Sequence, residues 1–338
     1  MKNNTPLRRV QITGGSTYIV SLPKSWAESL NLKAGDYVRL IPQPDNSLLL
    51  IPRSGKESSL EAVITASPIS SPEEVARELI ACYLAGYDTI KIELDGRVDE
   101  FKSYLKKVMR TKLIGLELVE ESTNYMVVRS LIGYVDLPIV DALKRMNLIT
   151  LSMCRDAIKA LKTRDRSLMN DVIQRDDEVD RLYLFCVRQL KSAVENRILM
   201  REVGLRSARE CLGYRLIIKS IERVADHAVR IASQISALKT RSGSRLIDKI
   251  AKMSEIVFTI YENAVQSLFN SDMKQANKVI VRVRGLEEIE KDLVKSIFES
   301  RVGVEAAIAL RLVIESLRRM AEYAADIAEI VINLAIKR

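Results

Sequence analysis

Apolar residues between positions 310 and 334 recur at alternating spacings of three and four residues, the pattern of a helix with one buried face. The eight positions are Leu310, Val313, Leu317, Met320, Ala324, Ile327, Val331 and Leu334. Subtracting 96 from each number gives a second set, in which every residue is again apolar or aromatic. That set is Tyr214, Ile217, Ile221, Val224, Ala228, Ile231, Ile235 and Leu238. The chain therefore contains two copies of one helical unit.

Helical periodicity extends over the whole segment after Pro138, which is the last proline of the chain. Because the connections between the predicted helices are short, neighbouring helices are expected to be antiparallel. We predict two three-helix bundles, one in repeat 1 (138–240) and one in repeat 2 (241–338). The expected helices are 138–161, 168–196 and 207–239 in the first copy, then 244–270, 273–300 and 304–336 in the second.

The first 55 residues are punctuated by proline and glycine and show short alternating or β-branched runs, which indicate strands. A unit of this size with two hairpins has too small a core to be stable alone, so we expect a β-rich head (1–55) that dimerises. Its expected elements are strands at 7–13, 18–22, 37–42 and 48–52, with a short helix at 23–30.

Residues 56–137 alternate between strand and helix patterns and predict a small α/β domain. Neither a phosphate-binding loop nor an acid–base pair is evident there, so the segment could be a spacer or a sensor. The expected order is strand 60–66, helix 72–85, strand 89–94, helix 98–109, and strands 116–121 and 125–130. The fold class is therefore α+β multidomain, with a β head, an α/β middle domain and an all-α body.

Charge is distributed unevenly among these parts, although the whole chain has 53 basic and 44 acidic residues. The head is net basic and the middle domain net acidic, so an anionic partner such as nucleic acid is expected to meet the head. The helical body is also net basic. There the basic residues are interleaved with acids, which is typical of a solvated helix surface.

The cysteine and histidine content argues against several kinds of site. The four cysteines show no CxxC spacing, which indicates reduced thiols in a cytoplasmic protein rather than disulfides or a zinc site. With His227 as the only histidine, a hydrolase triad or a multi-histidine metal site is not expected. We also expect no signal peptide and no membrane-spanning segment, because no apolar run is long enough.

Two pairs of carboxylates are spaced one helical turn apart in the first repeat. Asp176 and Asp180 belong to one predicted helix, and Glu222 and Asp226 belong to the next. Like charges at this spacing repel, whereas a shared cation would make the arrangement favourable. Four carboxylates would suit a hard cation such as Fe, Mn, Mg or Ca. Because they point away from the apolar seam, we expect such a site on the bundle surface. The alternative is a solvated acidic face.

The second repeat departs from this pattern. Leu286 and Glu290 occupy the positions of the first acidic pair, and Arg318 and Glu322 those of the second. An Arg–Glu pair at this spacing is already favourable without a cation. A full second cluster, with Glu290 and Glu322 as ligands, is therefore doubtful.

The head resembles the SpoVT/AbrB swapped-hairpin family. The resemblance rests on Tyr18-Ile-Val-Ser-Leu-Pro-Lys-Ser-Trp26, on Leu30-Asn-Leu32 and on Gly35-Asp36. It implies an intertwined homodimer that binds DNA, with Arg8, Arg9 and Lys24 as the DNA-facing residues. The helix carries Ala27 and Glu28 where such regulators often have a basic pair, so a head that only dimerises remains the alternative.

The helical body resembles the PhoU family of phosphate-uptake regulators. The motifs that carry the resemblance are RDDEVDRLY, which starts at Arg175, and ERVADHAVRIA, which starts at Glu222. The resemblance implies that Asp176, Asp180, Glu222 and Asp226 bind a metal cluster, with iron first and Mn, Mg or Ca as alternatives. His227 follows the second motif's aspartate and is a weaker ligand candidate.

Together the two resemblances predict a dimeric regulator of phosphate uptake that binds DNA through its head and carries metal in its body. Expected partners are DNA, a second copy of the chain, components of a phosphate ABC transporter and inorganic phosphate. The alternative is an adaptor that restrains a phosphate transporter and uses its head only to dimerise. A metalloenzyme such as a phosphatase is less favoured, because no nucleophile or general base accompanies the carboxylates.

Overall fold

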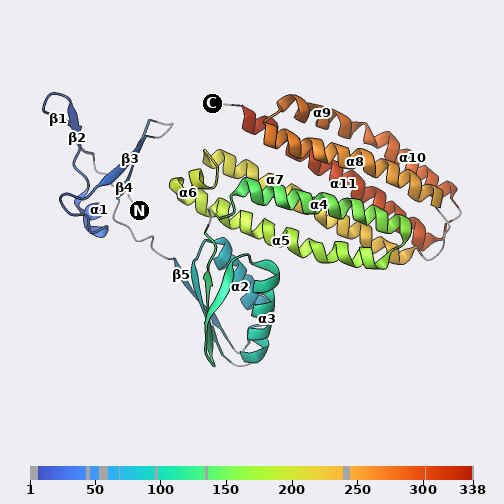
Figure 1. Cartoon of the computed structure of the whole chain (residues 1–338), viewed down its shortest axis with the longest axis horizontal. Helices are drawn as coiled ribbons and strands as arrows, with labels where there is room; N and C mark the ends of the chain where they lie inside the picture. Colours follow the sequence, from blue (N-terminus) through green and yellow to red (C-terminus); the bar gives the residue numbers. More distant parts are fainter. Residues whose placement is uncertain are drawn as a thin grey trace. The chain divides into compact units, whose positions relative to one another are not determined.

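The computed structural model describes residues 7–42, 46–52, 60–67, 69–95, 98–133, 136–238, 244–300 and 302–336. The chain divides into two compact units, Met1–Ser59 and Leu60–Arg338 (Figure 1). Each unit is described by itself below.

The first unit consists of two antiparallel hairpins and a short helix. Gly14 and Gly15 adopt positive φ angles of 63° and 81° in the first hairpin turn, a conformation that glycine adopts without strain. None of the described residues of this unit is buried, and Tyr18 and Tyr37 are 74% and 73% exposed. The unit therefore has no core of its own in a single copy. Its elements are β1 (Gln11–Thr13), β2 (Thr17–Ile19), α1 (Lys24–Ser29), β3 (Val38–Pro42) and β4 (Leu48–Pro52).

The second unit begins with the α/β domain expected from the sequence. Its four strands form one sheet in the order β5-β6-β8-β7, in which β5 and β6 are parallel and the other pairs are antiparallel. Alternate residues on β6 and β8 are buried, because both helices pack on one face of the sheet. The elements are β5 (Glu61–Ala66), α2 (Pro72–Leu84), β6 (Thr89–Leu94), α3 (Val98–Lys112), β7 (Leu116–Glu121) and β8 (Tyr125–Ser130).

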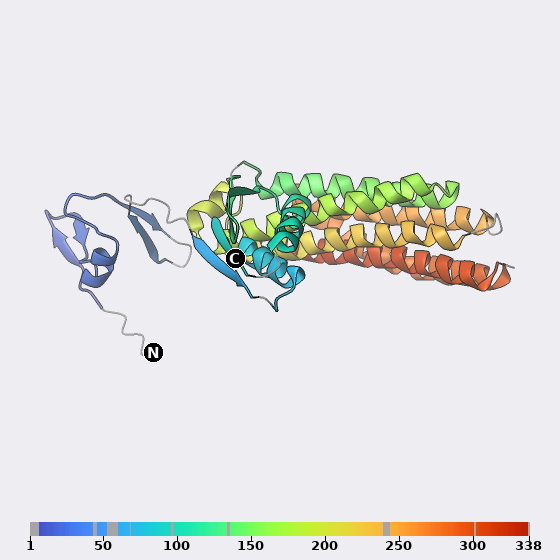
Figure 2. The same ribbon diagram turned by 90° about the horizontal axis from the view of Figure 1, so that it is seen from below.

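The rest of the second unit is helical, and its long helices run side by side (Figure 1, Figure 2). Helices α2 and α3 of the α/β domain pack against α5. The first repeat contains α4 (Ile139–Thr163), α5 (Arg166–Glu195), α6 (Arg197–Glu202), α7 (Ala208–Ser233) and the 3-10 turn η1 (Gln234–Ala237). The second contains α8 (Ser244–Asn270), α9 (Met273–Arg284), α10 (Leu286–Glu299) and α11 (Val304–Ala335).

The helical bundles of the two repeats share one continuous apolar core. Both predicted seams lie inside it, with every member buried except Tyr214 and Leu334, which pack against its edge. The seams meet because α7 and α11 pack against each other. Burial of this continuous apolar surface is the main contribution to the stability of the body.

Four helices differ from the sequence-based expectation. The helix predicted at 98–109 continues to Lys112, the last residue of α3. The predicted helix 273–300 breaks into α9 and α10 at Gly285, a residue with low helix propensity. The predicted helix 207–239 ends earlier, at Ser233, where its last turn tightens into η1. The short helix α6, capped by the side chain of Asn196, was not expected.

The cysteines match the expectation of reduced thiols. All four cysteines are free, and Cys154, Cys186 and Cys211 are buried. Over the described ranges, no helix combines the length and the apolar character that crossing a membrane requires.

Candidate functional site

The four predicted carboxylates of the first repeat come together where α5 packs against α7. Asp176 and Asp180 lie one turn apart on α5, and Glu222 and Asp226 lie one turn apart on α7. The negative charges of the other three groups all raise the pKa of Asp176. These four residues are called the carboxylate cluster below.

Burial is the largest cause of the raised pKa values in the carboxylate cluster. It raises the pKa of Asp176 to about 7, and the charges of Asp180, Asp226 and Glu222 add to this effect. Burial also raises the pKa values of Asp180, Glu222 and Asp226. Glu222 is only 8% exposed, whereas Asp176, Asp180 and Asp226 are half-buried, so the cluster lies partly below the surface of the body.

Two lysines compensate part of this negative charge. The Lys219 Nζ lies 2.6 Å from both carboxylate oxygens of Glu222. The Lys112 Nζ, at the end of α3 in the α/β domain, lies 4.0 Å from Asp180 Oδ2. The α/β domain therefore contributes a cation to a site built on the helical body.

Asp176 has less compensation than its neighbours. Its Oδ1 is buried and has no hydrogen-bond partner among the described residues. Leaving a buried acceptor unsatisfied costs about 1–3 kcal/mol. The raised pKa and the orphaned oxygen together mark Asp176 as the position at which an added cation or proton would be most stabilising.

The fit of a metal ion to the carboxylate cluster rests on the chemistry of the donors. Four carboxylates offer only oxygen ligands, which suit hard cations. With the side chains as placed in the described ranges, no three or more His, Cys, Asp and Glu residues form a group that could hold a metal ion. The donor atoms match a hard cation in charge and in chemistry, but the side chains as placed are not gathered around one position, and Lys112 and Lys219 lie beside the oxygens that would bind it.

The corresponding acids of the second repeat are paired with arginines. Glu290 lies 3.4 Å from Arg311, and Glu322 lies 2.9 Å from Arg318 and 2.5 Å from Arg319. Leu286, at the position of Asp176, is buried in the core. These acids are neutralised by the chain itself, so the asymmetry between the repeats expected from the sequence is present in the structure.

Comparison with known proteins places the helical body in a family. The model of the PhoU domain matches residues 143–235 and 250–331, which together make up more than half of the chain. The chain belongs to the PhoU family. The two matched segments correspond, one each, to the two repeats found from the apolar seams.

Individual PhoU proteins share this body at low sequence identity. A phosphate-specific transport system accessory protein PhoU homolog of Xylella fastidiosa is 24% identical over 63% of this chain and 89% of its own length. The homolog of Aquifex aeolicus is 27% identical over 46% of this chain and 71% of its own. The crystal structure of the phosphate transport system regulatory protein PhoU from Streptococcus pneumoniae covers 59% of this chain and 96% of its own, with 17% identity and a TM-score of 0.50. That likeness concerns the fold alone.

The N-terminal unit matches a second family model. Residues 11–58 match the model described as antidote-toxin recognition MazE, bacterial antitoxin. This chain is thus a PhoU-family protein with an N-terminal swapped-hairpin domain.

The predicted DNA-facing residues of this domain are exposed. Arg8 and Arg9 precede β1, which begins at Gln11 rather than at Leu7 because only residues 11–13 pair with the neighbouring strand β2. Lys24 starts α1 and lies 3.7 Å from Glu28, so the acidic residue of that helix offsets part of its charge.

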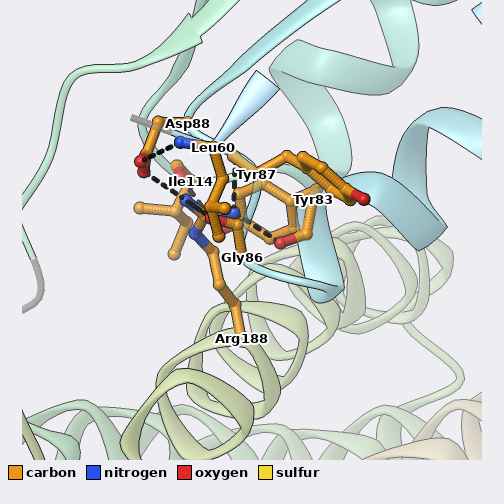
Figure 3. A network of polar contacts seen from close by, with 7 residues as sticks. All are labelled: Leu60, Tyr83, Gly86, Tyr87, Asp88, Ile114 and Arg188. Atoms are coloured by element: carbon orange, nitrogen blue, oxygen red, sulfur yellow. Dashed lines mark hydrogen bonds and ion pairs between the residues drawn. The ribbon is translucent and has the colours of Figure 1, made fainter. Parts of the chain in front are cut away.

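One polar network at the base of the α/β domain was not anticipated from the sequence (Figure 3). The buried Arg188 of α5 donates hydrogen bonds to the carbonyls of Tyr83, Tyr87 and Gly86, at 2.5, 2.9 and 3.4 Å. It also lies 3.3 Å from Asp88 Oδ1. A cation at the C-terminal end of α2 satisfies carbonyls that the helix leaves free. The sequence did contain a sign of this network, because Arg188 directly follows a run of apolar and aromatic residues, 182–187, on a predicted helix.

Arg188 and Lys112 together connect the two parts of the second unit of this PhoU-family chain. Arg188 binds the end of α2, and Lys112 brings the end of α3 to Asp180. Both contacts involve α5, the helix that carries half of the carboxylate cluster. The α/β domain is thus attached to the helix whose charge state a bound cation would change.

Proposed function

We propose that this chain regulates phosphate uptake as a homodimeric accessory of a phosphate transport system. The observation that carries the proposal is the match of the PhoU domain to both helical repeats. Its relatives are named as accessory or regulatory proteins of phosphate transport, which supports a regulatory rather than a catalytic role. A cytoplasmic location stays a prediction from the reduced cysteines.

Deletion of the gene in its host tests this proposal. Loss of the chain should raise phosphate uptake, or expression of the transporter genes, in phosphate-replete medium, and the wild-type gene should restore both. Unchanged uptake and expression at high and low phosphate would contradict a role in phosphate regulation.

The finer form of the proposal is that the head binds DNA as a homodimer. It is supported by the match to an antitoxin family, by the absence of buried residues in the described part of the head, and by the exposed Arg8 and Arg9. Electrostatic contacts to DNA phosphates weaken as salt rises, so binding should fall steeply between about 0.05 and 0.2 M salt.

A gel-shift titration with DNA from upstream of its own gene and of phosphate-transporter genes tests DNA binding. Arg8→Ala with Arg9→Ala should weaken binding at least about tenfold. Lys33→Ala with Arg39→Ala removes the same charge elsewhere in the head and serves as the control. Equal loss in both double variants, or no salt-sensitive binding at micromolar protein, would contradict DNA contact through Arg8 and Arg9.

We further propose that the carboxylate cluster binds a hard metal cation, with iron as the first candidate. Support comes from the four oxygen donors and from the raised pKa and orphaned oxygen of Asp176. Elemental analysis of protein purified without chelator should find metal in wild type and a loss in Asp180→Ala and Asp226→Ala. Glu290→Ala, at the matching position of the second repeat, is the control and should retain the metal.

The second candidate function is an adaptor that restrains a transporter and uses its head only to dimerise. The word accessory in the names of the relatives favours it. The variant Arg8→Ala with Arg9→Ala separates the two functions in cells. An adaptor would retain control of phosphate uptake in this variant, whereas a regulator that acts through DNA would lose it.

A further inference from the structure

A basic pocket of about 320 Å³ lies between α7 and α11, where the two repeats meet. It is lined by four basic residues, two acids, one histidine and one tyrosine. These are Lys219, Arg223, Arg230 and Arg319, then Asp226 and Glu315, and finally His227 and Tyr323. The excess of positive charge in a concave site indicates an anionic ligand. We call it the seam pocket.

Internal symmetry explains how the basic side chains come to face one another. Arg223 and Arg319 occupy the same position in the two repeats, and so do His227 and Tyr323. The helices α7 and α11 are antiparallel, since Arg209 near the start of α7 donates to the carbonyl of Asn333 near the end of α11, at 2.7 Å. The seam pocket therefore lies on the axis that relates the repeats, where equivalent residues from each repeat converge.

The two equivalent arginines share one aromatic ring. The guanidinium of Arg223 lies 5.5 Å from the centre of the Tyr323 ring, and that of Arg319 lies 5.0 Å from it. Each contact with the ring is favourable, but two guanidinium groups held around one ring repel each other. An anion bound between them would remove this repulsion.

Two of the four cations form no ion pair, although the charges of both act on Asp226. Lys219 is paired with Glu222, and Arg319 with Glu322. Arg223 and Arg230, in contrast, form no ion pair with any residue that the structure describes. Neither guanidinium is held in a direct ion pair, and the planar donor array of arginine suits the oxygens of phosphate groups.

His227 supplies an independent sign of a missing ligand. It is 6% exposed, lines the seam pocket, and its Nδ1 has no hydrogen-bond partner in the described part of the chain. One ring nitrogen of a neutral histidine carries a proton, so this side chain can donate an N–H to a bound anion.

We propose that the seam pocket is a binding site for a phosphate-bearing anion, held by Arg223, Arg230 and Arg319 with a hydrogen bond from His227. Its volume is at the lower end of small-ligand sites, which suits inorganic phosphate with water, pyrophosphate or a small phosphorylated metabolite. The choice of phosphate among oxyanions rests on the proposed function; the site itself rests on the charges and the orphaned histidine.

Asp226 links the seam pocket to the carboxylate cluster, because it belongs to both. Its negative charge opposes an anion in the seam pocket, and a cation in the carboxylate cluster would neutralise that charge. Cation and anion should therefore bind with positive coupling, each raising the affinity for the other. This arrangement differs from phosphate bound directly on a metal ion, for which Asp226 would be required.

Calorimetric titration of the full-length, chelator-treated protein tests the proposal, with inorganic phosphate, pyrophosphate and ATP as separate probes and sulfate as the competing oxyanion. At least one phosphate probe should bind more tightly than sulfate. Arg223→Gln and Arg230→Gln should each weaken binding about tenfold, and Asp226→Asn should strengthen it. Arg201→Gln, an exposed arginine outside the seam pocket, is the matched control and should bind as wild type.

Several outcomes would overturn the proposal. No binding of any phosphate probe at millimolar concentration would do so, as would equal affinities in Arg223→Gln, Arg230→Gln and wild type. Binding to untreated protein that is absent after chelator treatment or in Asp226→Asn would instead place phosphate on the metal. These titrations use purified protein and do not depend on the gene deletion. A negative titration would therefore contradict the seam pocket and not the role in phosphate regulation. A negative deletion test would contradict that role and not the binding site.

Discussion

The guanidinium of Arg188 lies 4.9 Å from the centre of the Tyr83 ring and also donates a hydrogen bond to the Tyr83 carbonyl. Tyr83 in turn donates from its hydroxyl to the carbonyl of Ile114, at 3.0 Å. One arginine of the helical body therefore holds the end of α2 and, through Tyr83, the segment after α3. The α/β domain is fixed to α5 at a buried point rather than through a flexible tether.

Replacing Arg188 by methionine should lower the free energy of unfolding by about 2–4 kcal/mol, because several buried carbonyls would lose their donor. Urea unfolding followed by circular dichroism measures the change. Lys191→Met, an exposed position on the same helix, should stay within about 0.5 kcal/mol of wild type. Similar small effects of both substitutions would show that the Arg188 network does not stabilise the fold.

The titration of Asp176 predicts a dependence of stability on pH in the metal-free protein. Its pKa is about 7 in the folded state and near 4 in the unfolded state, so the folded state binds the extra proton between these values. The free energy of unfolding should therefore fall as pH rises from about 4 to 7. Besides its own members, the charged groups that act on the carboxylate cluster are Asp177, Lys112, Lys219, Arg223 and Arg230.

Asp176→Asn isolates this effect, because asparagine cannot ionise. In chelator-treated protein at pH 8, the variant should be more stable than wild type by about 1 kcal/mol, and the difference should shrink or reverse near pH 5. Urea unfolding at both pH values measures it, with the exposed Asp248→Asn as the control. A variant that is less stable than wild type at pH 8 would contradict the raised pKa.

Lys112 should compete with a cation at the carboxylate cluster. Lys112→Gln removes a positive charge 4.0 Å from Asp180, so it should tighten binding of Mn²⁺ to chelator-treated protein by about three- to tenfold. Lys106→Gln on the same helix is the control, because Lys106 pairs with Glu121 instead. Unchanged or weaker Mn²⁺ binding in Lys112→Gln would indicate that the lysine does not oppose the cation.

Exposed apolar residues of the head predict that its core forms between two chains. Ile12 and Leu40 are 61% and 57% exposed in one copy, and a second copy would bury such side chains. Ile12→Asp with Leu40→Asp should weaken self-association at least about tenfold, as measured by sedimentation equilibrium. Val63→Asp, at an equally exposed site on the sheet of the α/β domain, should leave it unchanged. A double variant that associates like wild type would exclude these residues from the dimer interface.

The sequence was most informative where burial follows a regular period. The seams of α7 and α11 were predicted residue by residue, because a helix that packs along its length repeats its apolar positions every three or four residues. The strands of the α/β domain were predicted almost to their ends for the same reason, with a period of two. The break at Gly285 was missed because one residue of low propensity does not interrupt that pattern.

The candidate sites were predicted only in part. The spacing of Asp176, Asp180, Glu222 and Asp226 along two helices was sufficient to pair them. Lys112 and Arg188 could not be assigned, since their partners lie far away in the sequence and depend on how the α/β domain packs on α5. The seam pocket was also missed, because it requires the antiparallel packing of α7 and α11 that brings the repeats face to face.

Fusion of two related repeats into one polypeptide has an evolutionary consequence at the seam pocket. In a symmetric dimer of single repeats, one codon change would alter both sides of the axis together. In this chain His227 and Tyr323 occupy equivalent positions yet differ, with ring centres 5.8 Å apart. Each side of the axis can therefore be selected independently, which allows one half to retain an acidic face while the other becomes cationic.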